Sequence, residues 1–115
     1  NICGWTPLHI AAQYGYVDIV RLLIGSSADL DKSMDGWTPL ISASSEGHTM
    51  IVRLLIDAGA SINLYIDGSC CTALMMASRN GHIEIVQLLI QAKADMLMCS
   101  DKNVNGVHWY RQDAT

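Results

Sequence analysis

Four histidines and four cysteines are the side chains of this sequence best suited to bind a metal or to act as nucleophiles. They are His9, His48, His82, His108, Cys3, Cys70, Cys71 and Cys99. A zinc site needs several ligands within about 2.0–2.3 Å of one ion, and C-x-x-C spacing is its usual sign in sequence. No C-x-x-C spacing occurs here, and the adjacent Cys70 and Cys71 would pair only with strain. The pattern favours reduced thiols over a disulfide framework.

The histidines occupy two recurring positions of the sequence. His9 and His108 share one position, and His48 and His82, each directly after a glycine, share the other. Equivalent positions in stacked helical repeats lie about 8–10 Å apart, too far for a common metal ion. We therefore expect structural histidines, with His9 tying one repeat to its neighbour by a hydrogen bond, and neither a metal site nor a cofactor.

No arrangement of residues typical of catalysis is visible. Ser69, Cys70 and Cys71 have no histidine near them in sequence to act as a base. The glycines are spaced as helix caps and turns, not as a phosphate-binding loop. The sequence predicts that the protein is not an enzyme, an expectation that a cleft of convergent ionisable groups would overturn.

Composition narrows the class of protein further. A length of 115 residues suits one domain, and half of the residues are hydrophobic, which argues against disorder. Seven basic and eleven acidic residues give a net charge of −4, which does not favour nucleic acid. The longest apolar run, Ala73–Ala77, is far shorter than the roughly 20 residues of a membrane span. With no visible signal peptide, we expect an intracellular protein, cytoplasmic or nuclear.

Three segments of nineteen residues align without gaps and begin at Thr6, Thr38 and Thr72, at intervals of 32 and 34 residues. In each, a threonine suited to cap a helix begins a short helix, and a glycine suited to a left-handed cap ends it. A second helix follows, with apolar residues at helical spacing. The predicted helices cover residues 6–14, 16–25, 38–46, 48–57, 72–80 and 82–91. Leu23, Leu55 and Leu89 occupy one core position of the second helix.

The segment Thr6-Pro-Leu-His-Ile-Ala-Ala12, followed by Gly15 and by Ile19-Val20-x-Leu-Leu23, resembles the ankyrin repeat. The resemblance covers about residues 4–101. It implies a single all-α domain over 1–115, a solenoid of stacked helix-turn-helix units joined by hairpin loops. The units are 4–35, 36–67, 70–101 and a degenerate partial repeat at 102–115, which is either a terminal cap or frayed. The hairpin tips are expected near 1–5, 33–37, 66–71 and 99–104.

Two turn residues differ from the ankyrin pattern, and one hairpin residue matches a position that is modified in some members of the family. The family has glycine in a left-handed turn where this sequence has Ser27, Gly59 and Lys93, so the serine and the lysine are expected to be strained there. Asn63 resembles the hairpin asparagine that an iron-dependent hydroxylase modifies in some ankyrin-type repeats. An asparagine chosen for its turn geometry is the simpler explanation of this position.

The resemblance implies a non-catalytic protein–protein interaction module that binds through the hairpin tips and the exposed side of the first helices. The positions that match are Trp5, Gln13, Tyr14, Met34, Asp35, Trp37, Ser45, Glu46, Cys71, Arg79 and Asn80. Trp5 and Trp37 share one repeat position, so we expect them side by side with Tyr14 close. This aromatic group is either a binding patch or a shield over the core.

A second hypothesis is a structural spacer within a longer ankyrin-repeat array. The first unit has no capping helix before it, so its N-terminal face is expected to be open. That face predicts either further repeats in a longer parent protein or self-association of the isolated piece. The identity of any protein partner cannot be read from these residues.

Overall fold

The computed structural model describes residues 5–68 and 71–93 of the chain. Its helices there are α1 (Pro7–Tyr14), α2 (Val17–Gly25), α3 (Pro39–Glu46), α4 (Thr49–Asp57), α5 (Ala73–Asn80) and α6 (Ile83–Gln91). All six predicted helices are confirmed. Each begins one residue later than predicted because the first residue of each predicted range is the N-cap.

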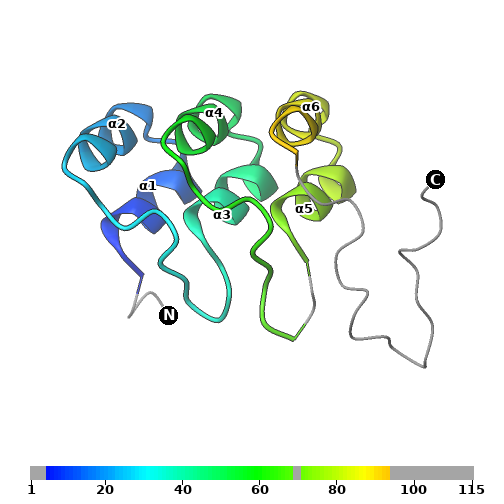
Figure 1. Ribbon diagram of the computed structural model, residues 1–115, viewed down its shortest axis with the longest axis horizontal. Coiled ribbons are helices and arrows are strands. Elements are labelled where there is room, and N and C mark those ends of the chain that lie inside the picture. Colours follow the sequence, from blue (N-terminus) through cyan, green and yellow to red (C-terminus); the bar gives the residue numbers. More distant parts are fainter. Residues whose placement is uncertain (1–4, 69–70, 94–115) are drawn as a thin grey trace.

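The helices form two layers (Figure 1). Helices α1, α3 and α5 lie in one row, α2, α4 and α6 lie in a second row above it, and the long loops extend away from both. Within the described residues, β structure is limited to the isolated bridges Met34–Trp37 and Tyr65–Thr72. The all-α solenoid expected from the sequence is confirmed.

Threonine and glycine define the ends of the first helices. The Thr6, Thr38 and Thr72 side chains accept hydrogen bonds from backbone N–H groups three residues later, which satisfies donors that the first turn leaves unpaired. At the other end, Gly15 and Gly47 have φ of 84°, a left-handed cap that a side chain would strain.

Burial follows the repeat position and the number of neighbouring units. Ile51 and Ile85 are 0% exposed, whereas Ile19 at the same position of the first unit is 44% exposed. Leu55 and Leu89 are likewise fully buried, but Leu23 is only partly buried. Leu23 is therefore less central than Leu55 and Leu89, because none of the described residues packs a preceding unit against the first one.

The loop between the first two units contains the expected hairpin. Met34 and Trp37 exchange backbone hydrogen bonds of 3.0 and 3.1 Å, and Asp35 and Gly36 between them have φ of 57° and 87°. Positive φ at both central residues is typical of the two-residue hairpin turn. In the next loop the Ile66 N–H donates to the Cys71 carbonyl at 2.9 Å. The tip expected at 99–104 and the partial repeat at 102–115 lie outside the described residues.

The predicted left-handed turns are also confirmed. Ser27 has φ of 65°, Lys93 has φ of 73°, and Gly59 at the equivalent position has φ of 97°. A left-handed conformation costs a residue with a side chain roughly 1–2 kcal/mol, and glycine avoids this cost.

We expect Ser27→Gly and Lys93→Gly to be neutral or to stabilise the fold by up to about 1 kcal/mol, since glycine also gains freedom in the unfolded chain. Chemical denaturation would measure the change. Gly59→Ala is the matched control and should destabilise by about 1 kcal/mol through backbone strain alone, because no atom of the described residues lies within 4 Å of an added Cβ. A marked loss of stability in either glycine variant would mean that the serine or lysine side chain makes contacts that outweigh the strain.

Candidate protein-interaction surface

His9 joins the first unit to the second. Its ring is fully buried, and Nδ1 lies 3.1 Å from the Thr6 backbone N–H, which donates to it. The opposite ring nitrogen, Nε2, lies 3.0 Å from the Trp37 carbonyl oxygen. A carbonyl only accepts, so Nε2 carries the proton and the imidazole is neutral. The expected hydrogen bond between neighbouring repeats is confirmed.

This environment makes the stability of the fold depend on pH. Burial lowers the pKa of His9, although hydrogen bonds to the Trp37 and Lys32 carbonyls partly oppose that effect. Since the folded pKa lies below the unfolded value of 6.5, the unfolded state binds more protons at acidic pH. The contribution of His9 to the free energy of unfolding is therefore fully present above about pH 6.5 and declines as the pH falls below that value.

Urea denaturation between pH 7.5 and 5 should show this decline in the wild-type protein. His9→Ile, which introduces the residue found at the equivalent position 41, should flatten the slope, because His48 and His82 remain in both proteins. An unchanged slope in the variant would show that protonation of His9 does not control acid sensitivity.

His48 and His82 form a second set of links between units. His48 Nε2 lies 3.1 Å from the Gln13 carbonyl, and His82 Nε2 lies 3.0 Å from the Ser45 carbonyl. The His48 ring also packs against Gly15, and the His82 ring against Gly47. In each case a Cβ added to the glycine would lie only 2.7 Å from the ring. Sequence reasoning identified the recurring Gly-His pairs but missed this role.

The C-terminal ends of the first helices form a continuous row. Gln13 Nε2 donates to the Glu46 carboxylate at 3.1 Å, and Asn80 Nδ2 donates to the Ser45 carbonyl at 2.9 Å. The row thus brings together predicted residues from all three units. Arg79, exposed at the end of the row, donates to the Met76 sulfur at 3.5 Å.

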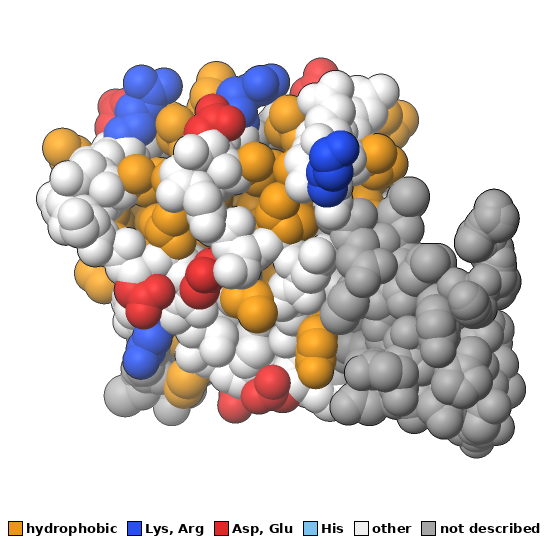
Figure 2. All heavy atoms as spheres, viewed as in Figure 1, with side chains coloured by type: hydrophobic (Ala, Val, Ile, Leu, Met, Phe, Trp, Pro, Cys, Tyr) orange, Lys and Arg blue, Asp and Glu red, His pale blue; other side chains and the backbone are white. Residues whose placement is uncertain are grey.

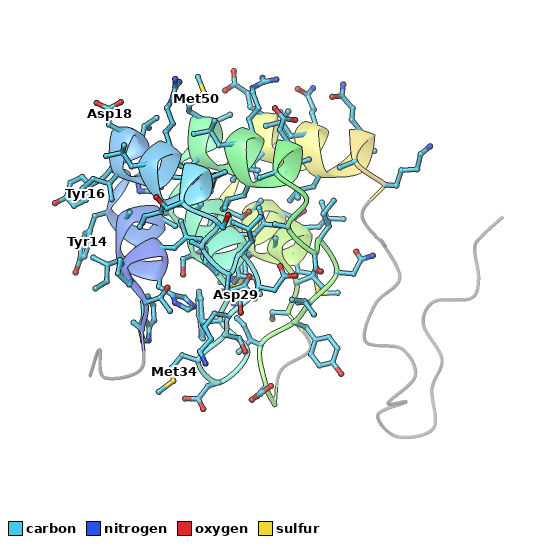
Figure 3. All side chains as sticks on the ribbon, turned by 60° about the vertical axis from the view of Figure 1, so that its left-hand side comes forward. Tyr14, Tyr16, Asp18, Asp29, Met34 and Met50 are labelled. Atoms are coloured by element: carbon cyan, nitrogen blue, oxygen red, sulfur yellow. The ribbon has the colours of Figure 1, made fainter. Side chains whose placement is uncertain are left out.

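The three aromatic residues do not form one patch. Trp5 is half-buried, with its ring 5.0 Å from the His9 ring, and Trp37 packs against the hydrophobic core. Tyr14 lies at the opposite end of α1, roughly 12 Å along the helix, and its ring is 6.1 Å from that of Tyr16. Figure 3 shows both tyrosines projecting from the same edge of the first unit. The expectation that Tyr14 lies close to the tryptophans is wrong.

The exposed face of the first unit carries an apolar hollow of about 350 Å³. It is lined by Trp5, Pro7, Ile10, Ala11, Tyr16 and Ile19. Tyr14 is 63% exposed and Leu22 is 71% exposed in the same unit. This side of the first unit therefore exposes apolar side chains that the later units bury.

The remaining predicted residues lie on the hairpins. Asp35 is exposed at the turn, whereas Met34 and Cys71 are half-buried. The Asp67 N–H donates to the Asp35 carbonyl at 3.0 Å, which joins the tips of adjacent hairpins. Asp31 strengthens this junction by accepting hydrogen bonds of 2.8 Å from both the N–H and the hydroxyl of Ser61.

The described part of the chain shows no group of three or more His, Cys, Asp or Glu side chains placed to hold a metal ion. In the same residues, no helix is long and apolar enough to cross a membrane.

Known proteins identify the repeat. The family described as ankyrin repeats (3 copies) matches residues 1–66 and 27–99, which together cover most of the chain. The chain belongs to the ankyrin-repeat family. Ankyrin repeats are protein-binding units, so its broad role is a protein–protein interaction module.

A shorter segment of this ankyrin-repeat chain is similar to protein phosphatase 1 regulatory subunit 27 from human and from mouse. Each is 59% identical over 32 residues. The match covers 28% of this chain and only 21% of each relative. It extends over about one repeat.

Proposed function

We propose that this ankyrin-repeat chain binds a protein partner through its hairpin tips and the exposed side of its first helices. The observation that carries the proposal is the hydrogen-bonded row from Gln13 to Asn80, which holds side chains of three units in one fixed order. A surface ordered before binding loses less conformational entropy when a partner docks.

The predicted residues contribute in two ways. The exposed Tyr14, Asp35, Glu46, Arg79 and Asn80 are available for direct contact. The half-buried residues support the surface, and Trp37 does so by packing on the core below the hairpin. Trp37 is therefore assigned a supporting role and not direct contact. Truncating it would disturb the fold as well as the surface.

A capture experiment tests the proposal. The bait is the immobilised chain, compared with a Tyr14→Ala/Asp35→Lys/Glu46→Lys variant and with an Arg21→Glu/Met50→Lys control. The control residues are exposed on the second helices, in the other layer. Proteins retained by the wild type and control but lost from the first variant support this surface. Equal capture by all three baits would contradict it.

The role is proposed to be regulatory by contact and not catalytic. The relatives named as phosphatase regulatory subunits, although matched over a small part of their length, belong to a class that acts through another protein. An intracellular site of action, cytoplasmic or nuclear, accords with that class and is part of the proposal.

The open face of the first unit supports the second candidate function, a spacer within a longer array. Ile19, at 44% exposed, lies where a preceding unit buries Ile51 and Ile85 completely. An exposed apolar face of this kind also promotes self-association.

We expect the isolated chain to self-associate with rising concentration, and Ile19→Lys/Leu22→Lys to reduce that association. Multi-angle light scattering at about ten-fold steps in concentration would measure the mass. Met50→Lys, which removes an exposed apolar side chain from α4, is the control. A wild-type chain that stays monomeric would show that this face is not adhesive.

A further inference from the structure

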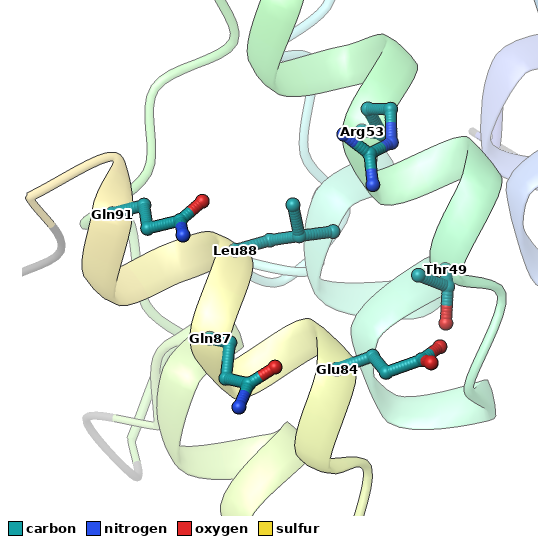
Figure 4. Close-up of a pocket in the computed structure, with 6 residues that line it drawn as sticks. All are labelled: Thr49, Arg53, Glu84, Gln87, Leu88 and Gln91. Atoms are coloured by element: carbon teal, nitrogen blue, oxygen red, sulfur yellow. The ribbon is translucent and has the colours of Figure 1, made fainter.

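A polar groove runs between α4 and α6, in the layer of second helices (Figure 4). Its first hollow, about 280 Å³, is lined by Thr49, Arg53, Glu84, Gln87, Leu88 and Gln91. A second hollow of about 200 Å³ shares Arg53, Leu88 and Gln91 with the first, so the two form one continuous groove. Figure 2 shows charged side chains along this upper edge of the molecule.

The charged groups of the groove do not neutralise each other. Arg53 and Glu84 line the first hollow, and Arg53 and Asp57 line the second. Among the described residues, these three side chains form neither an ion pair nor a side-chain hydrogen bond with one another. Figure 4 shows Glu84 directed toward Thr49, while Arg53 lies one turn further along α4. One helical turn is about 5.4 Å, so the Glu84 carboxylate and the Arg53 guanidinium follow one another along the groove.

Two glutamines on α6, the helix that also carries Glu84, are likewise separated by about one helical turn. Gln87 and Gln91 are four residues apart on α6, and such side chains lie about 5–6 Å from each other. Each amide both donates and accepts, which suits the C=O and N–H groups of a peptide backbone. Residues i and i+2 of an extended peptide are about 6.6 Å apart, close to the same spacing.

We propose that the groove between α4 and α6 binds an extended peptide segment of a partner protein carrying a basic and an acidic side chain two residues apart. The basic side chain meets Glu84, and the acidic side chain meets Arg53 with its methylene groups on Leu88. Gln87 and Gln91 bind the backbone. The argument is charge complementarity, and it is independent of the hairpin surface because the groove belongs to the other layer.

Synthetic peptides would test this site on the intact chain. The probe is acetyl-Gly-Ser-Lys-Ser-Glu-Ser-Gly-amide, and the comparison peptide has Lys-Ser-Lys at its centre. Binding is followed by the NMR side-chain amide signals of Gln87 and Gln91, with Gln13 as an internal reference in the other layer. Because the Lys-Ser-Lys peptide replaces attraction to Arg53 with repulsion, and exposed charge pairs contribute modestly, we expect the Lys-Ser-Glu peptide to bind about fivefold more tightly.

Arg53→Glu should reverse the preference between the two peptides, which distinguishes charge recognition from nonspecific binding. Arg53 is exposed, so the variant is expected to fold, and its groove should favour the Lys-Ser-Lys peptide by a similar factor. Gln87→Ala/Gln91→Ala lacks the reporting side-chain amides, so its binding is followed by the backbone amide signals of Glu84 and Leu88, and it should weaken both peptides. The proposal is overturned if the Gln87 and Gln91 signals do not move, or if Arg53→Glu leaves the ranking of the peptides unchanged.

Discussion

Leu55→Ala is expected to lower the free energy of unfolding by about 2–5 kcal/mol, the usual cost of truncating a buried leucine. Leu55 is 0% exposed and lies in the middle unit, with packed helices on both sides. The cost combines lost transfer free energy with the cavity left behind, and neighbours held from two sides cannot collapse into it. Urea denaturation followed by circular dichroism would measure it.

Leu23→Ala is the matched control, since the same side chain is removed from the same repeat position. Leu23 is only partly buried, so its truncation should cost clearly less than that of Leu55. Equal losses at the two positions, or a loss below about 1 kcal/mol at Leu55, would contradict the assigned core.

Gly47→Ala is expected to destabilise the fold by about 2–3 kcal/mol through two separate effects. The left-handed cap with φ of 84° strains any residue with a side chain, at roughly 1–2 kcal/mol. The new methyl group would also lie 2.7 Å from Cε1 of His82, so that ring must move. Its hydrogen bond to the Ser45 carbonyl, worth about 0.5–1.5 kcal/mol, would then be lost or weakened.

Gly81→Ala separates the two effects. Gly81 has φ of 78°, and no atom of the described residues lies within 4 Å of an added Cβ, so only the backbone strain is expected to apply. Thermal denaturation should place the Gly47 variant below the Gly81 variant. In a His82→Ala background the two changes should become similar. If they are already similar in the wild type, the ring adjusts freely and the packing against Gly47 contributes little.

Much of this fold follows from local sequence. The recurring threonine and glycine mark both ends of each first helix, and apolar residues at helical spacing mark the second, because caps and amphipathic periodicity are local properties. The left-handed turns at Ser27 and Lys93 were predictable for a similar reason, since Gly59 holds the equivalent place.

The interaction surface was less predictable, because it depends on how the units stack. Repeat spacing predicted that Tyr14 lies close to Trp5 and Trp37, but Tyr14 lies at the opposite end of α1 from Trp5. One end of α1 points Trp5 onto His9, and the other end sets Tyr14 beside Tyr16. The groove between α4 and α6 combines residues that are more than 30 positions apart in the sequence, so no local pattern could predict it.

The amino-acid sequence by itself therefore determined the type, number and boundaries of the described helices, together with the left-handed turns, since these arise from interactions within a few residues. Only the tertiary structure decided which of three equivalent leucines is most buried, which histidine meets which carbonyl, and which charged side chains stay unpaired. Those properties depend on the neighbour that each unit has on either side, and a repeated sequence is nearly the same whether that neighbour is present or not.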